Sequence, residues 1–342
     1  MAAKTSISLV TGATSMLGRK VAERLIEAGN TVRVILRDAP KDNPEWRMLP
    51  AGVVPYVADI ALKDHKDEET LRQACMGVTN IFHIAGAAYN YLNTYDQLID
   101  VNVVGTENVI KAWLDANPAP AKGHLIFTSS VAVYGHDRPG ELLNETSDIK
   151  PDGPYAMSKY MATHVIESWC AANPRLSYTV ARLGTFYGEG YESGFFKLFK
   201  LVSEGKMSYR GKGSNHLTIV HVDDAVDALI EIYKNREKSA NKVYNITDGI
   251  AHTQKELLDC VVKFLNAKPI TNSTYPLFAK ILASRNDIRF DEYEFLNSDR
   301  MVNIDLARKE LGFKPSRSIE KDGKALAEQF LSMHAKVTED TV

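Results

Sequence analysis

The chain has 342 residues, of which 44% are hydrophobic and 25% charged, a composition that is typical of globular proteins and excludes a disordered or fibrous chain. Its 41 basic and 43 acidic residues give a net charge of −2, so no strong field attracts it to nucleic acid or anionic lipid. No segment approaches the ~18 to 20 continuous apolar residues of a membrane span. The N-terminus lacks the apolar core of a signal peptide, and the three cysteines lack metal-ligand spacing. We therefore expect a cytoplasmic, metal-free protein.

The first half of the chain alternates short β-rich runs with longer helical patterns. Strands are expected at 7–10, 31–36, 53–58, 80–84, 125–128 and 177–183. Helices are expected at 17–28, 98–116 and 155–172, and Gly29-Asn30 supplies a stop signal for the first of them. Strands separated by helices imply right-handed crossovers, so the sequence predicts an α/β fold with a doubly wound parallel sheet covered on both faces.

The pattern changes after Leu183. Residues 184–213 are rich in glycine and aromatic side chains, with a helical stretch at 195–204. A strand at 218–222 is expected to return to the sheet, followed by a helix at 224–233, a strand at 242–246 and mostly helical sequence from 253. We assign residues 1–183 plus about 218–250 to the sheet domain and 184–217 plus about 251–335 to a smaller, mostly helical substrate lobe. The polar residues 336–342 are expected to form a disordered tail.

A glycine-bearing loop connects the first strand to the first helix. In this place glycines permit a tight turn, and the helix N-terminus offers free N–H groups and its dipole to a pyrophosphate. The full fingerprint would carry glycine at position 15, but the chain has Ser15, whose Cβ restricts the approach of a phosphate. The strand and helix context nevertheless favours a dinucleotide site over a glycine turn without a ligand. The expected contacts are Gly12, Thr14, Ser15, Met16 and Leu17.

The end of the second strand decides how the ribose of such a cofactor is held. An acidic side chain there would accept a hydrogen bond from a free 2′-hydroxyl, whereas an arginine suits a 2′-phosphate. The chain has Arg37 where the acid would be expected, followed by Asp38. A solvated arginine paired with Asp38 is the alternative, but we favour NADP(H), with NAD(H) still possible.

Tyr155 and Lys159 lie four residues apart at the start of a helix, so their side chains share one face. A free tyrosine has a pKa of about 10, and a nearby ammonium lowers that pKa because it favours the phenolate. Tyr155 could then give a proton to a ketone oxygen as hydride arrives, or take one from an alcohol as hydride leaves. Chance alone predicts about one such pair in a chain of this composition, so the spacing needs structural context.

The context comes from a strand that ends in hydroxyl groups. Residues 125–130 (LIFTSS) end in Ser129 and Ser130 at the C-terminal edge of the sheet, where ligands of open α/β sheets gather. Ser130 could polarise the substrate oxygen while Tyr155 transfers the proton. Serines at a strand end are often plain turn residues. Because Ser129 is adjacent to Ser130, either serine could be the one that contacts the substrate oxygen.

Taken together, these motifs resemble the extended short-chain dehydrogenase/reductase family over residues 5 to about 320. The resemblance rests on residues 11–18 (TGATSMLG), Asp59-Ile60, 83–87 (HIAGA), Asn102, 128–130 with Tyr134-Gly135, Tyr155 with Lys159, 221–224 (HVDD) and 311–315 (LGFKP). It implies a Rossmann-type fold for the sheet domain, a catalytic triad of Ser130, Tyr155 and Lys159, and a homodimer formed through the Asn102 and Tyr155 helices. The cofactor contacts that it implies in addition are Asp59, Ile60, Ala85, Gly86, Ala87, Asn102, Thr128, Tyr155, Lys159, Leu183 and Thr185.

Other titratable groups have simpler interpretations. Asp223 and Asp224 precede an apolar-periodic run, so we expect them to cap a helix rather than to act in catalysis. His83 and His221 lie in β-rich runs and are interpreted as core histidines whose hydrogen bonds are satisfied.

A cluster of tyrosines follows the fourth strand, where the family places a loop of the active site. Tyr89, Tyr91 and Tyr95 could line a hydrophobic substrate pocket, and an exposed tyrosine-rich loop is equally compatible with the sequence.

The family resemblance also separates substrate classes. Sugar-nucleotide dehydratases are disfavoured because Ser130 is followed by Val131 rather than by carboxylates. Nucleotide-sugar enzymes usually have asparagine at the position of Thr185 and arginine at that of Leu217, both of which meet the diphosphate. Leucine supplies no charge-assisted donor. Four cations could still supply charge from another angle: Lys197, Lys200, Lys206 and Arg210.

We therefore favour an NADP(H)-preferring oxidoreductase that interconverts a secondary alcohol and a ketone on an apolar, sterol-like small molecule. The alternative is a nucleotide-sugar 4-epimerase that uses the same three residues. A catalytically silent NADP sensor is the third hypothesis, which the complete triad disfavours.

Overall fold

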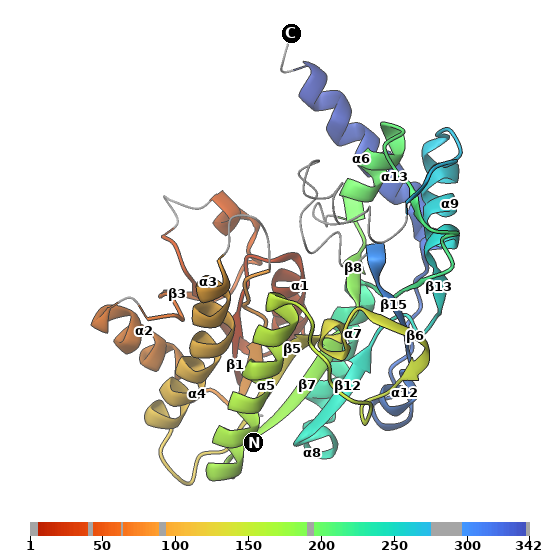
Figure 1. Cartoon of the computed structure of the whole chain (residues 1–342). Coiled ribbons are helices and arrows are strands. Elements are labelled where there is room, and N and C mark those ends of the chain that lie inside the picture. The colour runs from red at the N-terminus through yellow and green to blue at the C-terminus, as the bar shows by residue number, and fades with distance from the viewer. Residues whose placement is uncertain are drawn as a thin grey trace.

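The protein is described by a computed structural model that covers residues 6–39, 44–62, 64–88, 94–189, 195–274 and 296–339. Its centre is a seven-stranded sheet with the strand order β12-β7-β5-β4-β1-β2-β3, and every pairing in it is parallel (Figure 1). The strands are β1 (Ile7–Thr11), β2 (Thr31–Leu36), β3 (Val54–Val57), β4 (Asn80–His83), β5 (Gly123–Ser130), β7 (Leu176–Leu183) and β12 (Lys242–Ile246). The predicted Rossmann-type α/β fold is confirmed.

Helices cover both faces of this sheet, as the alternating pattern predicts. One face packs on α1 (Met16–Glu27), α7 (Val222–Lys234) and α12 (Asp305–Leu311). The other packs on α2 (His65–Cys75), α4 (Gly105–Ala116) and α5 (Pro154–Ala172). The smaller elements beside the sheet are the turns η1 (Pro44–Met48) and η3 (Val131–Tyr134), and the helices α3 (Tyr95–Ile99), η2 (Asp100–Val104) and α8 (Arg236–Ser239).

A third apolar cluster lies mostly in the part of the chain that we assigned to a substrate lobe. It is built from α6 (Phe195–Ser203), α9 (Gln254–Leu265) and α13 (Ile319–Glu339), which lie together at the upper right of Figure 1. Short two-stranded pairs surround it: β6 (Asp137–Leu143) with β15 (Asp299–Val302), β8 (Thr185–Tyr187) with β11 (Ile219–His221), β9 (Tyr209–Arg210) with β14 (Ser273–Thr274), and β10 (His216–Leu217) with β13 (His252–Thr253).

Three expectations differ from the structure. The strand expected at 218–222 does not return to the main sheet, because β11 pairs with β8 and the sheet edge beside β7 is taken by β12. The segment with α12 lies in the range assigned to the substrate lobe, yet Ile304 and Leu311 pack into the sheet core. The tail expected to be disordered from 336 is helical to Glu339.

Other parts of the assignment were missed or are untested. The helix α2 and the strand β6 were not expected, since both are rich in polar residues. The division of the chain between the two lobes stays a prediction. Within the described ranges, no helix is long and apolar enough to cross a membrane.

Candidate active site

The glycine loop between β1 and α1 is shaped so that only glycine fits at two of its positions. Gly12 has φ +71°, and a Cβ there would lie 2.6 Å from the backbone nitrogen of Ala85. A Cβ on Gly18 would lie 2.2 Å from the carbonyl oxygen of Gly12. The loop therefore turns tightly against the end of β4 and leads into the N-terminus of α1, as an anion-binding helix requires.

Ser15, the departure from the fingerprint, is the N-cap of α1. Its backbone is extended (φ −70°, ψ 156°), so the position does not require glycine. The hydroxyl donates to the carbonyl oxygen of Gly12 at 2.7 Å and accepts from the nitrogen of Gly18 at 3.1 Å. The side chain is exposed and bound to its own loop, so a phosphate can still approach the other N–H groups of the helix terminus. The residues present fit a dinucleotide pyrophosphate.

Lys159 points into the protein from the first turns of α5. Its side chain is 4% exposed, and Nζ donates to the carbonyl oxygen of Thr128 at 3.0 Å. Nζ also lies 4.9 Å from the ring centroid of Phe127 and 6.0 Å from that of Tyr155. Burial lowers the pKa of Lys159 to about 8, because a charged ammonium is poorly solvated there. The tyrosine and the lysine thus share the face that their spacing predicts.

A chain of hydrogen bonds fixes Asn102 against the Tyr155 helix. The Asn102 amide donates to the hydroxyl of Ser158 at 2.8 Å, and that hydroxyl donates to the carbonyl oxygen of Tyr155 at 2.8 Å. The same amide group pairs with the backbone of Ala87 in both directions, at 2.7 and 3.0 Å. Asn102 lies in the π-helical turn η2, a feature found often at functional sites. Ser158 was missed in the sequence, although a serine beside Lys159 on an apolar helix was a visible signal.

The two serines at the end of β5 differ in their surroundings. The Ser130 hydroxyl is half-buried and accepts a hydrogen bond from the nitrogen of Ala132 at 3.1 Å, which leaves its own proton available to donate. Ser129 is 4% exposed, and its hydroxyl has no hydrogen-bond partner among the described residues. The partly accessible hydroxyl is therefore that of Ser130, which supports its assignment over Ser129.

His83 is buried directly beneath this site. Its two ring nitrogens lie 2.8 Å from the hydroxyl of Thr11 and 2.9 Å from that of Thr106. Burial, helped by the charge of Lys159, lowers the pKa of His83 to about 3. The ring is therefore neutral near pH 7 and links β1 to α4, as expected of a core histidine. Thr128 donates to the His83 carbonyl oxygen at 3.3 Å.

The remaining predicted cofactor residues lie at the ends of strands, and one of them, Leu183, is the register partner of Ser130. Arg37 is 70% exposed and its Nε lies 3.2 Å from a carboxylate oxygen of Asp38. Asp59 and Ile60 are buried at the end of β3, where Asp59 accepts from the nitrogen of Ala61 at 3.0 Å. Leu183 is buried at the end of β7, and Thr185 begins β8 with its side chain half-buried.

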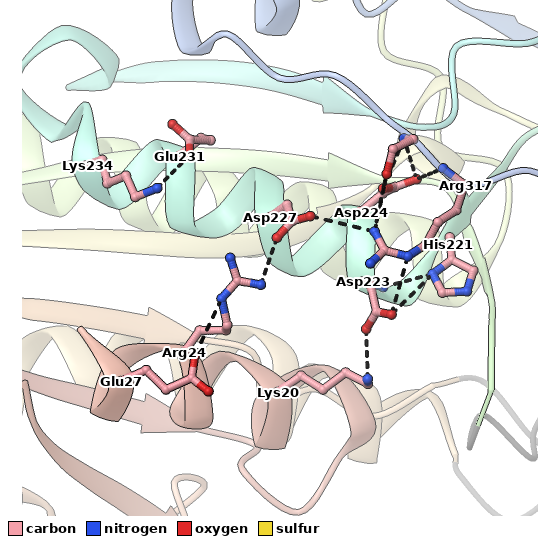
Figure 2. A network of polar contacts seen from close by, with 11 residues as sticks. Lys20, Arg24, Glu27, His221, Asp223, Asp224, Asp227, Glu231, Lys234 and Arg317 are labelled. Atoms are coloured by element: carbon pink, nitrogen blue, oxygen red, sulfur yellow. Dashed lines mark hydrogen bonds and ion pairs between the residues drawn. The ribbon is translucent and has the colours of Figure 1, made fainter. Parts of the chain in front are cut away.

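The prediction that Asp223 and Asp224 cap a helix is wrong in detail. His221 is the N-cap of α7, and it accepts a hydrogen bond from the nitrogen of Asp223 at 3.2 Å. Figure 2 shows the two carboxylates in a network with Lys20 and Arg317. Asp223 lies 2.7 Å from the ammonium of Lys20, and Asp224, which is 1% exposed, lies 3.0 Å from the guanidinium of Arg317. Their role is structural, but they join α7 to α1 and to the segment before α13.

Three of the four cations singled out in the sequence as possible phosphate contacts form ion pairs. The ion pairs are Lys200 and Lys206 with Glu204, at 3.9 and 2.8 Å, and Arg210 with Asp137, at 3.1 Å. The side chain of Lys197 lies outside the described part of the structure, as do Tyr89 and Tyr91, whereas Tyr95 is 47% exposed.

A Rossmann fold with a glycine loop, a buried lysine and an adjacent tyrosine defines a nicotinamide-dependent enzyme of the extended short-chain dehydrogenase/reductase type. The model of the NAD dependent epimerase/dehydratase family matches residues 8–247, and the chain therefore belongs to that family.

Individual relatives are similar to the chain at low identity. An N-acetyl-alpha-D-glucosaminyl-diphospho-ditrans,octacis-undecaprenol 4-epimerase of Escherichia coli O157:H7 is 28% identical over 79% of this chain and 76% of its own length. A 2-alkyl-3-oxoalkanoate reductase of Stenotrophomonas maltophilia is 28% identical over 91% of this chain and 96% of its own. Among solved structures, MoeE5 in complex with UDP-glucuronic acid and NAD has a TM-score of 0.74 at 21% identity, over 96% of this chain and 100% of that one.

Proposed function

We propose that the enzyme transfers hydride reversibly at the carbon of a secondary alcohol or ketone, with Tyr155 as the acid/base group. The observation that carries this proposal is the buried ammonium of Lys159, 6.0 Å from the ring of Tyr155 and on the same helix face. A positive charge at that place favours the phenolate, so that the tyrosine can exchange a proton near neutral pH.

The other groups of the site have supporting roles. Ser130 donates its free hydroxyl proton to the substrate oxygen and holds it within reach of Tyr155. Lys159 stabilises the phenolate, while Asn102 and Ser158 fix the backbone from which Tyr155 projects. Gly12 and the N-terminus of α1 hold the pyrophosphate of the dinucleotide, which, when bound, supplies or accepts the hydride.

The surroundings of the site favour reduction of an apolar ketone. Leu217, at the position where nucleotide-sugar enzymes carry a phosphate-binding arginine, is 1% exposed within the apolar core of the lobe. Arg210 and Lys206 are already paired with carboxylates, so a phosphate would have to compete with those carboxylates for the two cations. The end-to-end similarity to a 2-alkyl-3-oxoalkanoate reductase agrees with this substrate class.

The second candidate is a nucleotide-sugar 4-epimerase, and the comparisons favour it over the reductase. Several further relatives are UDP-glucose or UDP-glucuronate 4-epimerases, as is a solved structure with UDP-glucose. An epimerase would use the same pair of transfers twice: hydride leaves the sugar carbon and the proton leaves its oxygen, and both then return, the hydride to the other face of the ketone carbon. The contacts of Leu217 and Arg210 are the observations that speak against it.

For the cofactor, we propose NADP(H) rather than NAD(H). Solved neighbours carry NAD, and the support for a 2′-phosphate site is Arg37, which is 70% exposed at the end of β2 and free to turn from Asp38 toward a stronger anion.

We further propose a homodimer through α4 and α5, whose half-buried Met161 and Trp169 would be covered by the partner. Light scattering of the purified protein tests the dimer, and a monomeric mass contradicts it.

One set of assays separates the two functions. The oxidation of NADPH and of NADH is followed at 340 nm with ethyl 2-methyl-3-oxobutanoate, and UDP-glucose is tested for conversion to UDP-galactose. The reductase proposal expects ketone-dependent oxidation of NADPH and no binding of UDP by calorimetry. Sugar conversion together with UDP binding would replace it by the epimerase, and the absence of both activities would contradict each candidate.

A further inference from the structure

A buried polar cluster lies directly behind the catalytic turn. Ser130 caps the turn η3, and the far end of that turn is Tyr134, whose side chain is 0% exposed. The Tyr134 hydroxyl accepts a hydrogen bond from the guanidinium of Arg182 at 2.7 Å. It can donate in return to the side-chain oxygen of Asn245 at 2.8 Å or to the carbonyl oxygen of Asn144 at 2.9 Å. A group four residues from Ser130 is therefore fixed by two other strands.

The strand register places these partners in one row across the sheet. Ser129 of β5 is the register partner of Arg182 on β7, and Arg182 is the partner of Asn245 on β12. The next row contains Ser130 opposite Leu183. Register partners in a parallel sheet point to the same face. Ser129, Arg182 and Asn245 therefore form a polar row, one residue before the row that contains Ser130 and Leu183.

Burial of the charged guanidinium of Arg182 at this position costs free energy of folding. Arg182 is 8% exposed, and among the described residues its guanidinium donates to the Tyr134 hydroxyl at 2.7 Å and to the carbonyl oxygen of Glu145 at 3.5 Å rather than to a carboxylate. Its guanidinium stacks on the ring of Tyr134, 4.9 Å from the centroid. The acid nearby is Glu145, which accepts from the backbone nitrogen of Asn245 at 2.8 Å and whose pKa is raised by burial. Apolar residues could fill this volume at less cost, so a buried guanidinium here suggests a demand on geometry.

We infer that Tyr134 and Arg182 are positioning residues for Ser130, an inference that rests on the proposed function. Tyr134 anchors the turn that Ser130 caps, and Arg182 with Asn245 anchors Tyr134 to β7 and β12. The hydroxyl of Ser130 is thereby held at a fixed distance from Tyr155 and from the reacting oxygen. Tyr134 and Asn245 are 0% exposed and Arg182 is 8% exposed, so the cluster would act through the turn rather than by contact with the substrate.

The test compares Tyr134→Phe with Tyr244→Phe. Tyr244 is also 0% exposed, lies next to Asn245 on β12, and donates to Glu310 at 2.6 Å, away from the catalytic turn. Tyr134→Phe loses the hydrogen bond from Arg182 and one that the hydroxyl donates, and Tyr244→Phe loses the one to Glu310, so both variants lose stability. Only Tyr134→Phe is expected to lower kcat, by about 10- to 100-fold for a hydroxyl displaced by a fraction of an ångström to an ångström. KM stays near the wild-type value, because binding groups are unchanged.

The same change in a Ser130→Ala background decides whether Tyr134 acts through Ser130. The loss of kcat from Tyr134→Phe is expected to vanish there, because the group that it positions is gone. The assay uses ethyl 2-methyl-3-oxobutanoate, or UDP-glucose if the enzyme is the epimerase. Equal kcat in the Tyr134→Phe and Tyr244→Phe variants, or an undiminished loss in the Ser130→Ala background, overturns the inference.

Hydrogen exchange supplies a readout that needs no activity. The peptide that covers residues 129–135 is expected to exchange faster in Tyr134→Phe than in the wild type, and at the wild-type rate in Tyr244→Phe. Unchanged exchange in Tyr134→Phe contradicts the inference. If Tyr155→Phe and Ser130→Ala retain full activity, the proposed function is wrong instead. Faster exchange in Tyr134→Phe would then show only that Tyr134 stabilises the turn.

Discussion

Gly86 and Lys159 lie so close together that a Cβ on Gly86 would stand 2.9 Å from the lysine Nζ. The ammonium therefore occupies the space that any larger residue at position 86 would need. The small residue Gly86, which follows β4, leaves space for the ammonium group of Lys159 on α5. This space allows the charge to lie near Tyr155.

Gly86→Ala is expected to move the ammonium and to leave the fold intact. The nearest atom is the end of the flexible Lys159 side chain, and the Asn102 Oδ1, at 3.2 Å, must shift by only a few tenths of an ångström, so we expect a small cost in stability. The displaced charge no longer stabilises the phenolate, and we expect kcat to fall by about 10-fold or more. Steady-state kinetics measure this loss. In a Lys159→Met background Gly86→Ala should have no further effect, and an additive loss would disprove the relationship.

Tyr155→Phe is expected to lower kcat by about 100- to 10,000-fold, because it removes the proton that is exchanged with the substrate oxygen. Cofactor binding, followed by the quenching of protein fluorescence, should stay within experimental error. The matched control is Tyr160→Phe on the same helix, where the ring contacts His164 rather than Lys159. Comparable losses in the two variants would show that Tyr155 has no special part.

Lys159→Met is expected to lower kcat by about 100-fold or more, with a measurable residual rate, and to stabilise the protein without cofactor. Burial holds the pKa of Lys159 at about 8 against an ordinary 10.5, so the unfolded chain binds the proton more tightly. Below pH 8 the folded wild type carries the full cost of the buried charge, and we expect the methionine variant to be more stable by about 1 to 3 kcal/mol.

That difference should shrink as the pH rises from 8 toward 10.5, since the wild type then loses the proton in the folded state first. Urea unfolding of both proteins at pH 7 and pH 9.5 measures the change. Taking the difference between the two proteins cancels the titration of Cys75 and Cys170, whose pKa values are raised by burial. A difference that does not depend on pH would contradict the buried charge.

Ser15→Ala and Ser15→Gly test the serine in the phosphate loop. The alanine variant loses the N-cap of α1 and should be less stable by about 1 kcal/mol, whereas the glycine variant should lose only a few tenths. Both should still bind the cofactor, because the hydroxyl is bonded to Gly12 and Gly18. Calorimetric titration with NADP⁺ measures this. Loss of binding in both variants would mean that Ser15 contacts the phosphate itself.

Arg37→Gln is expected to weaken NADP⁺ binding by about 10-fold or more, with little effect on NAD⁺, because only the former carries a 2′-phosphate. Titration with 2′,5′-ADP and with 5′-AMP gives the same comparison without the nicotinamide. Arg72→Gln on α2, where the arginine pairs with Glu69, is the matched control. Equal affinity for both dinucleotides in the wild type would refute the NADP preference.

The sheet and the candidate site residues Tyr155 and Lys159 could be predicted because their signals are local. The run of Val32, Val34 and Leu36 with a glycine stop before it, and the Tyr155–Lys159 spacing, each follow from the period of a single element. The strand pairings between distant segments do not follow from these local signals, and the resemblance to the family supplied them.

The parts that could not be predicted depend on contacts between distant residues. His221 rather than an aspartate caps α7, because the buried Asp224 instead accepts from Ser316 and Arg317. The strand β11 leaves the sheet because β12 occupies the edge beside β7. Neither choice is visible within a window of ten or fifteen residues.

The contact between Asp224 and Arg317 has a consequence for the order in which the molecule is completed during synthesis. A carboxylate sealed inside the sheet domain has its charge compensated by a residue made 93 positions later. While the ribosome is still adding that stretch, burial of Asp224 would leave its carboxylate without the guanidinium. We therefore expect α7 to pack stably against the sheet only after residue 317 has been made.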